Sequence, residues 1–413
     1  MTRLIRDYCL SAVAALWRRL MRRASFIAVT GSYGKTTATQ CLGTILAESG
    51  PTNFEPMASN SRAGLAKVIL RTRPRHRFTP IEVGTNKPGA LWRAAWMIHP
   101  DIVVVLAVGD VHSNNFPDLD AIAAEKASLL CRQGRNGIAV LNADDPHVAA
   151  MQPLCRGRVL TFGRSPECDL RASEVEATWP SRLSFTVSAG NESCHIETNL
   201  VGEHWLSSVL GAIGAAVAVG VSLRQAASSV KKVRPTLGRM QPVEIREGAW
   251  LLRDERNTSI STLDAALNVL RDARGVRRIA VLGDVYDSPQ GRRERGVDLG
   301  RRAARSADMA VFIGKAIRPA KGAAVEAGMA RADVRGFRRK VEAADFLRGE
   351  LRSGDLVLLR GSGTRHFERI YFRLIGTIGC AISNCPIIPL CDYCSELQFR
   401  PDSGPQAVVG SNR

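Results

Sequence analysis

The sequence predicts an α/β protein with a mostly parallel sheet in its first large domain and a Rossmann-like second domain. Short apolar strands alternate with helix-length segments on both sides of Pro235-Thr-Leu-Gly238, where we expect a domain boundary. This rhythm is typical of parallel sheets that carry helices on both faces. Between Val159 and Val201, apolar and polar residues alternate instead, which indicates a small antiparallel patch in the first domain.

Residues 1–24 predict a basic amphipathic helix, because apolar residues are interspersed with arginines there. Such a helix either lies on a membrane surface or packs its apolar face on the protein, and the sequence leaves both options open. The apolar run from Cys9 to Trp17 is too short to span a bilayer. The arginines of this segment are Arg3, Arg6, Arg18, Arg19, Arg22 and Arg23.

We expect residues 25–234 to form the first domain and residues 235–378 the second, with a cysteine-containing tail at 379–413. The long uncharged run from Trp205 to Leu223 is better interpreted as a buried helix than as a membrane span. The expected strands are Phe26–Val29, Ile81–Gly84, Ile102–Ala107 and Gly137–Asn142 in the first domain, and Trp250–Arg253, Arg278–Gly283, Met309–Gly314 and Leu356–Leu359 in the second.

The composition favours an anionic partner. Among 413 residues, 57 are Lys or Arg and 39 are Asp or Glu, which gives a formal net charge of +18. Nucleotides, phosphorylated substrates and acidic membrane surfaces all suit this charge. Nucleic acid is disfavoured, because only 6% of residues are aromatic and they are not interleaved with the basic ones. Ten scattered cysteines without a recognisable signal peptide predict a reducing cytoplasm.

The most specific motif is Thr30-Gly-Ser-Tyr-Gly-Lys-Thr-Thr37, which directly follows an apolar strand. Its glycines let backbone N–H groups turn toward an anion at the positive end of the next helix. Lys35 is expected to reach the outer phosphates of a nucleotide, and Thr36 is expected to bind magnesium. The other candidate nucleotide-binding residues of the motif are Gly31, Ser32, Gly34 and Thr37.

Two further polar segments follow apolar strands of the same domain. Glu82 ends one strand, and His112-Ser-Asn-Asn-Phe116 follows another, with Lys126 fourteen positions after His112. The carboxyl edge of a parallel sheet is where ligands bind, so these side chains are candidates for the same site. An isolated Glu or His at a strand end is more often a cap, but the phosphate motif nearby favours the functional interpretation.

Seven motifs, taken in order, resemble the Mur ligases of peptidoglycan synthesis over about residues 26–370, most closely the members that add a dipeptide. They are Thr30–Thr37, Glu82-Val-Gly-Thr-Asn-Lys-Pro-Gly89, His112 with Glu125-Lys126, Leu141-Asn-Ala-Asp-Asp-Pro146, Gly238-Arg-Met240, Leu282-Gly-Asp284 and Arg360-Gly-Ser362.

The resemblance implies an ATP-dependent ligase that joins a carboxylate to an amine through an acyl phosphate. Negative charge concentrates where phosphate and carboxylate meet, so Lys35, magnesium and Arg239 are expected to screen it. By the resemblance, Thr36 and Glu82 hold one magnesium ion, and His112 holds a second magnesium or manganese ion. The implied partners are a carboxylate-bearing peptide or UDP-muramoyl peptide, and an amino acid or dipeptide amine.

The resemblance also implies that Lys126 is carbamylated; a surface lysine is the alternative interpretation. In the second domain, Asp254 is expected to accept a hydrogen bond from the ribose, and Asn257 to line the site. The family's adenine-binding amide is replaced by Ser208. Further departures from the family pattern are Arg256, Ser259, Ile260 and Arg360.

The phosphate motif begins near residue 30, without a preceding segment long enough for the domain with which family relatives grip UDP. The substrate is therefore expected to be either a UDP-linked peptide held in another way or a UDP-free peptide, polyamino acid or natural product. A noncatalytic nucleotide-binding scaffold is the third interpretation.

Four cysteines of the tail fall within fifteen residues, at Cys380, Cys385, Cys391 and Cys394. Four thiolates can hold zinc tetrahedrally, but this spacing is not that of a standard zinc finger. Unpaired or redox-linked cysteines are the alternative.

Overall fold

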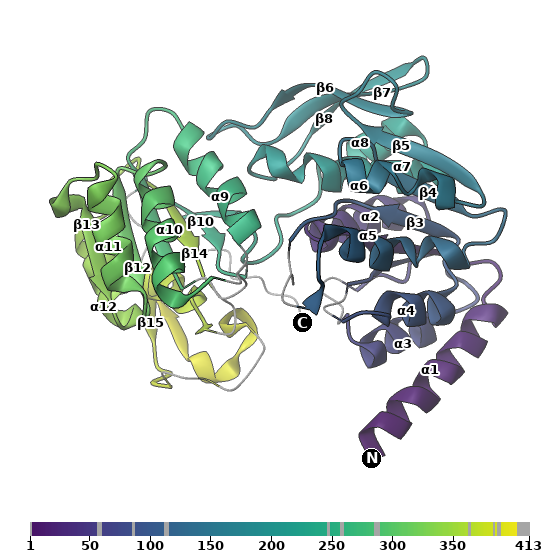
Figure 1. The fold of residues 1–413 in the computed structure, drawn as a ribbon, viewed down its shortest axis with the longest axis horizontal. Helices are drawn as coiled ribbons and strands as arrows, with labels where there is room; N and C mark the ends of the chain where they lie inside the picture. The colour runs from purple at the N-terminus through teal and green to yellow at the C-terminus, as the bar shows by residue number, and fades with distance from the viewer. Residues whose placement is uncertain are drawn as a thin grey trace. The chain divides into compact units, whose positions relative to one another are not determined.

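The computed structural model describes residues 2–55, 60–84, 87–110, 115–245, 248–256, 260–284, 290–361, 365–382, 385 and 390–402. Within it the chain forms two compact units (Figure 1). Unit 1 consists of residues 1–177, 182–199 and 203–234, and unit 2 consists of residues 178–181, 200–202 and 235–413.

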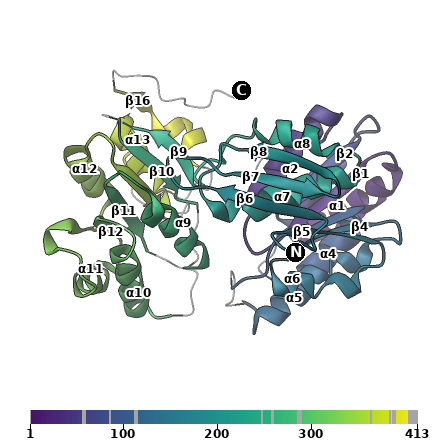
Figure 2. The ribbon, with the colours of Figure 1, turned by 90° about the horizontal axis from the view of Figure 1, so that it is seen from above.

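Unit 1 is built on an eight-stranded sheet with the order β2-β1-β3-β4-β5-β6-β7-β8. The strands from β2 to β6 run parallel, whereas β6, β7 and β8 pair antiparallel side by side (Figure 2). The predicted mostly parallel sheet with a small antiparallel patch is thus confirmed. The strands are β1 Ser25–Thr30, β2 Phe78–Glu82, β3 Ile102–Val105, β4 Ile138–Asn142, β5 Arg158–Gly163, β6 Leu170–Glu176, β7 Ser184–Ala189 and β8 Glu192–Glu197.

Helices cover both faces of the parallel part of this sheet. Val103 and Val105 of β3 belong to the core shared with α1, α3, α4 and α5. Val104, between them, faces α7, where a Cβ on Gly211 would lie only 3.2 Å from the valine side chain. The helices of unit 1 are α1 Thr2–Leu20, α2 Lys35–Ser49, α3 Arg62–Arg71, α4 Ala90–Ile98, α5 Leu119–Ala127, α6 Pro146–Ala149, α7 Leu206–Ala218 and α8 Leu223–Val230.

Helix α1 packs one face on α3 and α4 (Figure 1). Ala14 and Ala15 are buried in the contact, and the indole of Trp17 donates to the carbonyl of Thr72 at 2.8 Å. Arg18 is buried as well, and its guanidinium donates to the Asp101 carboxylate at 2.9 Å. In the part of the chain that the structure describes, no helix is both long enough and apolar enough to cross a membrane.

Unit 2 has a six-stranded sheet with the order β13-β12-β11-β14-β10-β9, parallel except for β9. This is the predicted second strand–helix alternation. Its strands are β9 Gln241–Glu244, β10 Trp250–Asp254, β11 Arg278–Gly283, β12 Met309–Ile313, β13 Val334–Phe337 and β14 Leu356–Arg360. Its helices are α9 Ile260–Asp272, α10 Arg292–Ala304, α11 Ile317–Glu326, α12 Lys340–Glu350 and α13 Glu368–Ile375.

The described part of the tail folds back onto unit 2. Strand β15 (Gly376–Ile378) pairs antiparallel with β16 (Phe399–Pro401). Cys391 and Leu397 are buried in the same hydrophobic core as residues of α12 and α13. The tail therefore contributes side chains to the interior of unit 2 and brings Cys380 and Cys391 to Arg369 of α13.

Candidate active site

The phosphate motif forms the turn between β1 and α2. Gly34 precedes the first residue of α2 and has φ of 81°, a left-handed conformation that favours glycine. A Cβ at this position would lie 2.5 Å from the Ser208 hydroxyl, which donates to the Gly34 carbonyl at 3.2 Å. The backbone therefore approaches α7 too closely for any side chain. The N–H groups of the first turn of α2 have no partner within the helix and suit a phosphate.

Lys35 lies across this turn. Its ammonium group donates to the carbonyls of Gly31 at 2.7 Å and Ser32 at 3.1 Å. The loop after β2 runs alongside, because a Cβ on Gly84 would lie 3.1 Å from Cε of Lys35. The charge of Lys35 is thus held at the turn, next to the segment that follows Glu82.

Ser32 ties the turn to the end of β3. Its backbone N–H donates to the Ala107 carbonyl at 2.8 Å. Its hydroxyl donates to the Gly109 carbonyl at 3.0 Å and accepts from the Gly109 N–H at 2.8 Å. Thr36 is half-buried in the first turn of α2, and Thr37 is buried. Hydrogen bonds to the segment after β3 therefore fix the phosphate motif, which itself follows β1.

Glu82 ends β2, paired with Val29 of the neighbouring strand β1. One of its carboxylate oxygens accepts from the side-chain amide of Asn60 at 2.8 Å. Asn60 precedes α3 and belongs to none of the motifs, so no sequence pattern predicts its place in the site. The hydroxyl of Thr36 and the carboxylate of Glu82 supply the oxygen donors that magnesium prefers.

Lys126 lies on α5 and is 7% exposed, so the interpretation as a surface lysine is wrong. Burial, and then the positive charge of Lys35, lower the pKa of Lys126 to about 7. The carboxylates of Glu125 and Asp145 act in the opposite direction but do not restore the ordinary value of 10.5. A large part of this amine is therefore neutral near pH 7.

The two neighbouring carboxylates hold the backbone around this lysine. Glu125 accepts from the N–H groups of Gly89 and Leu91, both at 2.7 Å, at the start of α4. Asp145 accepts from the N–H of Val108 at 2.8 Å and caps α6. Both acids fall within sequence motifs, but their roles could not be predicted because their partners are backbone groups of other segments.

The predicted residues of the second domain lie in unit 2. Asp254 is 1% exposed, forms an ion pair with Arg360, and accepts from the N–H of Met240 at 3.2 Å. In this structure both carboxylate oxygens, expected to meet a ribose, are engaged within unit 2. Arg239 is half-buried in the turn before Met240. His112 and Asn257 lie outside the described residues.

Ser208 and Cys391 lie in surroundings that differ from those predicted. Ser208, expected at an adenine pocket, is fully buried against the phosphate turn. Among the described residues, the one group of three or more potential metal ligands is His366, Glu368 and Cys391. Cys391 is thus grouped with a histidine and a carboxylate and not with the other three tail cysteines.

A strand, a glycine turn, a lysine and a helix N-terminus at the carboxyl edge of a parallel sheet define a P-loop nucleotide-binding protein. A family model described as the Mur ligase middle domain matches residues 29–216, and one described as the Mur ligase, glutamate ligase domain matches residues 238–363. The chain belongs to the Mur ligase family, whose members are ATP- and magnesium-dependent enzymes that form amide bonds.

Among curated relatives, the chain is 30% identical to the UDP-N-acetylmuramoyl-tripeptide--D-alanyl-D-alanine ligase of Mycobacterium tuberculosis, over 86% of this chain and 74% of that protein. Among solved structures, MurF from Acinetobacter baumannii matches with a TM-score of 0.81 at 24% identity, over 89% of this chain and 80% of that one. MurF ligase from Thermotoga maritima in complex with ADP matches with a TM-score of 0.77 at 20% identity, over 89% of this chain and 83% of that one.

The lowered pKa of Lys126 predicts a pH dependence of stability. Between a folded pKa of about 7 and the ordinary value of 10.5, the unfolded chain binds more protons than the folded one. The free energy of unfolding, compared with that of Lys126→Met, should therefore rise by about 2 kcal/mol from pH 7 to pH 9 and stay level below pH 6. Urea denaturation in CO₂-free buffer measures this difference.

A difference between the two proteins that stays constant from pH 6 to pH 9 would contradict the assignment of a near-neutral pKa. Lys67→Met, which removes an exposed lysine of the same unit, controls for the loss of one positive charge.

Proposed function

We propose that this protein joins the terminal carboxylate of a UDP-muramoyl tripeptide to the amine of D-alanyl-D-alanine, with conversion of ATP to ADP and phosphate. The observation that carries the proposal is the site of unit 1, where Lys35 at the phosphate turn lies near the buried amine of Lys126 and beside the segment after Glu82. The name of the Mycobacterium tuberculosis relative supports the choice of these substrates over others.

The chemistry requires activation of a carboxylate, which is a poor electrophile at neutral pH. Transfer of the γ-phosphoryl group from ATP forms a bond between phosphorus and the carboxylate oxygen and releases ADP. The substrate amine then attacks the acyl carbon, phosphate leaves, and the amine loses a proton. The ammonium of Lys35 and the N–H groups of α2 stabilise the charge on the phosphate oxygens.

The residues of unit 1 also fit the expected cation. Thr36 and Glu82 would hold a magnesium ion, which when bound neutralises phosphate charge and polarises the transferred group. The roles of His112 as ligand of a second ion, of Arg239 in screening charge, and of Asp254 and Asn257 at the ribose stay predictions. We assign the reaction to the cytoplasm, where ATP is available.

The same geometry supports the proposal that Lys126 is carbamylated. A neutral amine attacks CO₂ and loses a proton, so that a cationic side chain becomes an anionic carbamate. At a buried position whose pKa is lowered by burial and by Lys35, this change replaces repulsion between two cations with attraction. The carbamate would add an oxygen donor beside the phosphate turn.

Helix α1 supports peripheral binding to an anionic membrane surface. The face of α1 turned away from the protein exposes Val13, Leu16 and Leu20, which are 56%, 61% and 62% accessible. Arg19 and Arg22 are exposed next to this apolar stripe. Apolar side chains flanked by arginines suit insertion at the boundary between lipid headgroups and acyl chains.

The ligase proposal predicts ADP release only when both substrates are present. With UDP-muramoyl tripeptide and D-alanyl-D-alanine, mass spectrometry should find the tripeptide substrate enlarged by the dipeptide with loss of water. Lys35→Ala should lower the rate by about 100-fold or more, because one phosphate-binding cation is lost. Lys67→Ala, at an exposed position, should leave the rate unchanged.

Two results would contradict this proposal. Product formed only from UDP-free peptides or amino acids would establish a Mur-type ligase of another pathway. Nucleotide binding without ADP release on any substrate would favour the noncatalytic scaffold.

Carbamylation predicts a chemical rescue. Lys126→Ala should lose at least about 10-fold in rate, and short-chain carboxylic acids should restore part of the loss by placing a carboxylate in the vacated space. Wild-type protein supplied with ¹³C-bicarbonate should also show a carbamate carbon signal in NMR that Lys126→Ala lacks. Full activity of Lys126→Ala without added acid would rule out the role.

The membrane proposal predicts binding to vesicles that contain phosphatidylglycerol and weaker binding to pure phosphatidylcholine. Leu16→Glu should reduce co-sedimentation on the order of tenfold, because a charge replaces an inserted apolar side chain. Leu154→Glu is the matched control, since Leu154 is 52% exposed elsewhere in unit 1. Equal loss in both variants, or equal binding to both vesicle types, would contradict the proposal.

A further inference from the structure

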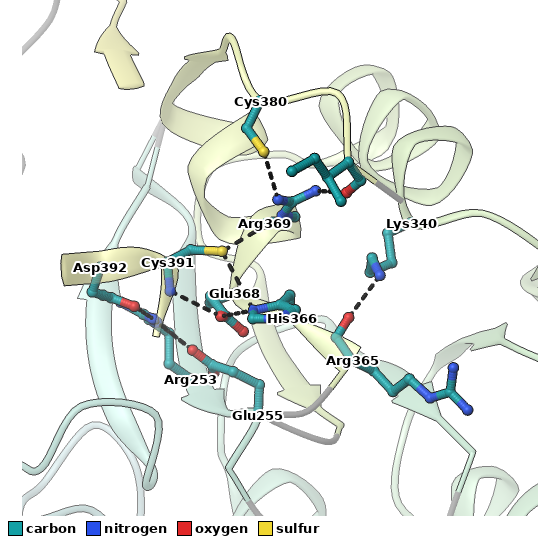
Figure 3. A network of polar contacts seen from close by, with 11 residues as sticks. Arg253, Glu255, Lys340, Arg365, His366, Glu368, Arg369, Cys380, Cys391 and Asp392 are labelled. Carbon is teal, nitrogen blue, oxygen red and sulfur yellow. Dashed lines mark hydrogen bonds and ion pairs between the residues drawn. The ribbon is translucent and has the colours of Figure 1, made fainter. Parts of the chain in front are cut away.

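A buried group of three potential metal ligands lies in unit 2, on the side of α13 that faces the tail (Figure 3). His366, Glu368 and Cys391 are 4%, 0% and 4% exposed, and their ligand atoms lie within 4.8 Å of one another. Nδ1 of His366 is 3.0 Å from a carboxylate oxygen of Glu368 and 3.5 Å from Sγ of Cys391. These separations are close to those between ligand atoms around one tetrahedral ion with bonds of about 2.0–2.3 Å.

The fold of the tail creates this group. Glu368 is the first residue of α13, and His366 precedes it by two positions. Cys391 comes from a short 3₁₀ turn in the tail, and its backbone N–H donates to Oε1 of Glu368 at 3.1 Å. The three side chains thus meet only because the tail folds back over α13.

The Glu368 carboxylate has a second oxygen without a partner. Oε2 is fully buried and accepts no hydrogen bond from any described group. An unpaired buried polar atom destabilises the fold, and a charged one does so more strongly. A cation held by both carboxylate oxygens of Glu368, beside His366 and Cys391, would satisfy Oε2 as well as Oε1.

Arg369 would stabilise a metal-bound thiolate of Cys391, whereas without a metal, burial raises the pKa of this thiol to about 12. The guanidinium of Arg369 is buried and donates to Sγ of Cys391 at 3.5 Å and to Sγ of Cys380 at 2.9 Å. Its third contact is the carbonyl of Ile382. Among the described residues, no carboxylate pairs with Arg369, and a thiolate accepts a charge-assisted hydrogen bond better than a thiol does.

The neighbouring Arg253 is neutralised differently. It lies between two carboxylates, at 2.8 Å from both Glu255 and Asp392. The carboxylates of Glu255, Asp392 and Glu368 thus lie near the guanidinium groups of Arg253 and Arg369, and burial raises the pKa of Glu255 to about 7. Lys340, at the outer edge, donates to a backbone carbonyl (Figure 3).

We propose that His366, Glu368 and Cys391 bind one divalent transition-metal ion of zinc type. Imidazole nitrogen, thiolate sulfur and carboxylate oxygen are the donors that zinc takes in proteins, and three protein ligands leave a fourth position for water. Binding releases the thiol proton of Cys391 to solvent. The ion joins the tail to α13. Among the tail cysteines, Cys391 alone is a ligand in this assignment.

Cobalt tests the assignment, because a thiolate bound to Co²⁺ gives a sulfur-to-metal charge-transfer absorption that oxygen and nitrogen ligands do not give. The full-length protein is stripped with chelator under reducing conditions and titrated with Co²⁺, then with Zn²⁺. We expect one equivalent of Co²⁺ with this absorption, displaced by one equivalent of Zn²⁺. The loop from Thr30 to Thr37 contains no cysteine, so cobalt bound there does not contribute.

The variants separate this site from a four-cysteine site. Cys391→Ser should abolish the charge-transfer absorption, and His366→Gln should weaken Co²⁺ binding on the order of tenfold or more. Cys385→Ser and Cys394→Ser are matched controls that should bind as wild type does. If circular dichroism shows that Cys391→Ser does not fold, Glu368→Gln tests the site instead. This variant should bind Co²⁺ more weakly but keep the charge-transfer absorption.

Absorption that persists in Cys391→Ser but disappears in Cys385→Ser or Cys394→Ser would overturn the proposal in favour of the four-cysteine site. Folded wild-type protein that shows no charge-transfer absorption at saturating Co²⁺ would overturn it in favour of a metal-free polar network.

Discussion

The constraint on which unit 1 depends is that a parallel sheet has to be covered on both faces. Strand β3 shows this directly, with Val103 and Val105 in one core and Val104 against α7. Because helices occupy both faces, polar side chains that serve a ligand have no position left except the strand ends and the loops that follow them. The phosphate turn after β1 and Glu82 at the end of β2 meet there for this reason.

Electrostatics then decides what the site can do. The positive charges of Lys35 and Lys126 repel one another at this partly buried site. Burial and this repulsion lower the pKa of Lys126. Lys35 has to remain protonated, because its positive charge stabilises the bound phosphates. The site therefore gains most from a ligand or a modification that brings negative charge, which is the situation that ATP, magnesium-bound phosphates and a carbamate all create.

In unit 2, the buried charges are neutralised by ion pairs. Arg253 and Asp254 are neighbours in β10, and each has its own oppositely charged partner from a distant part of the chain, Asp392 and Arg360. Buried ion pairs of this kind fix which segments meet, because a single partner left alone in the interior would be costly. Arg369 is the exception, because its guanidinium faces the sulfur atoms of Cys380 and Cys391 instead of a carboxylate.

The sequence by itself determined the fold class, the phosphate turn and the alternation of strands with helices, because these follow from short-range patterns: apolar runs, glycine positions and motif spacing. It also placed Lys126 and Glu82 among the site candidates through motif order. Tertiary structure alone decided the contacts between distant residues. No local sequence pattern predicts the contact of Asn60 with Glu82 or that of Cys391 with His366. The same holds for Arg360 and Asp254, which are 106 positions apart. Such pairs form only when loops and the tail fold back onto the sheets, and hydrophobic periodicity in the sequence does not predict that folding.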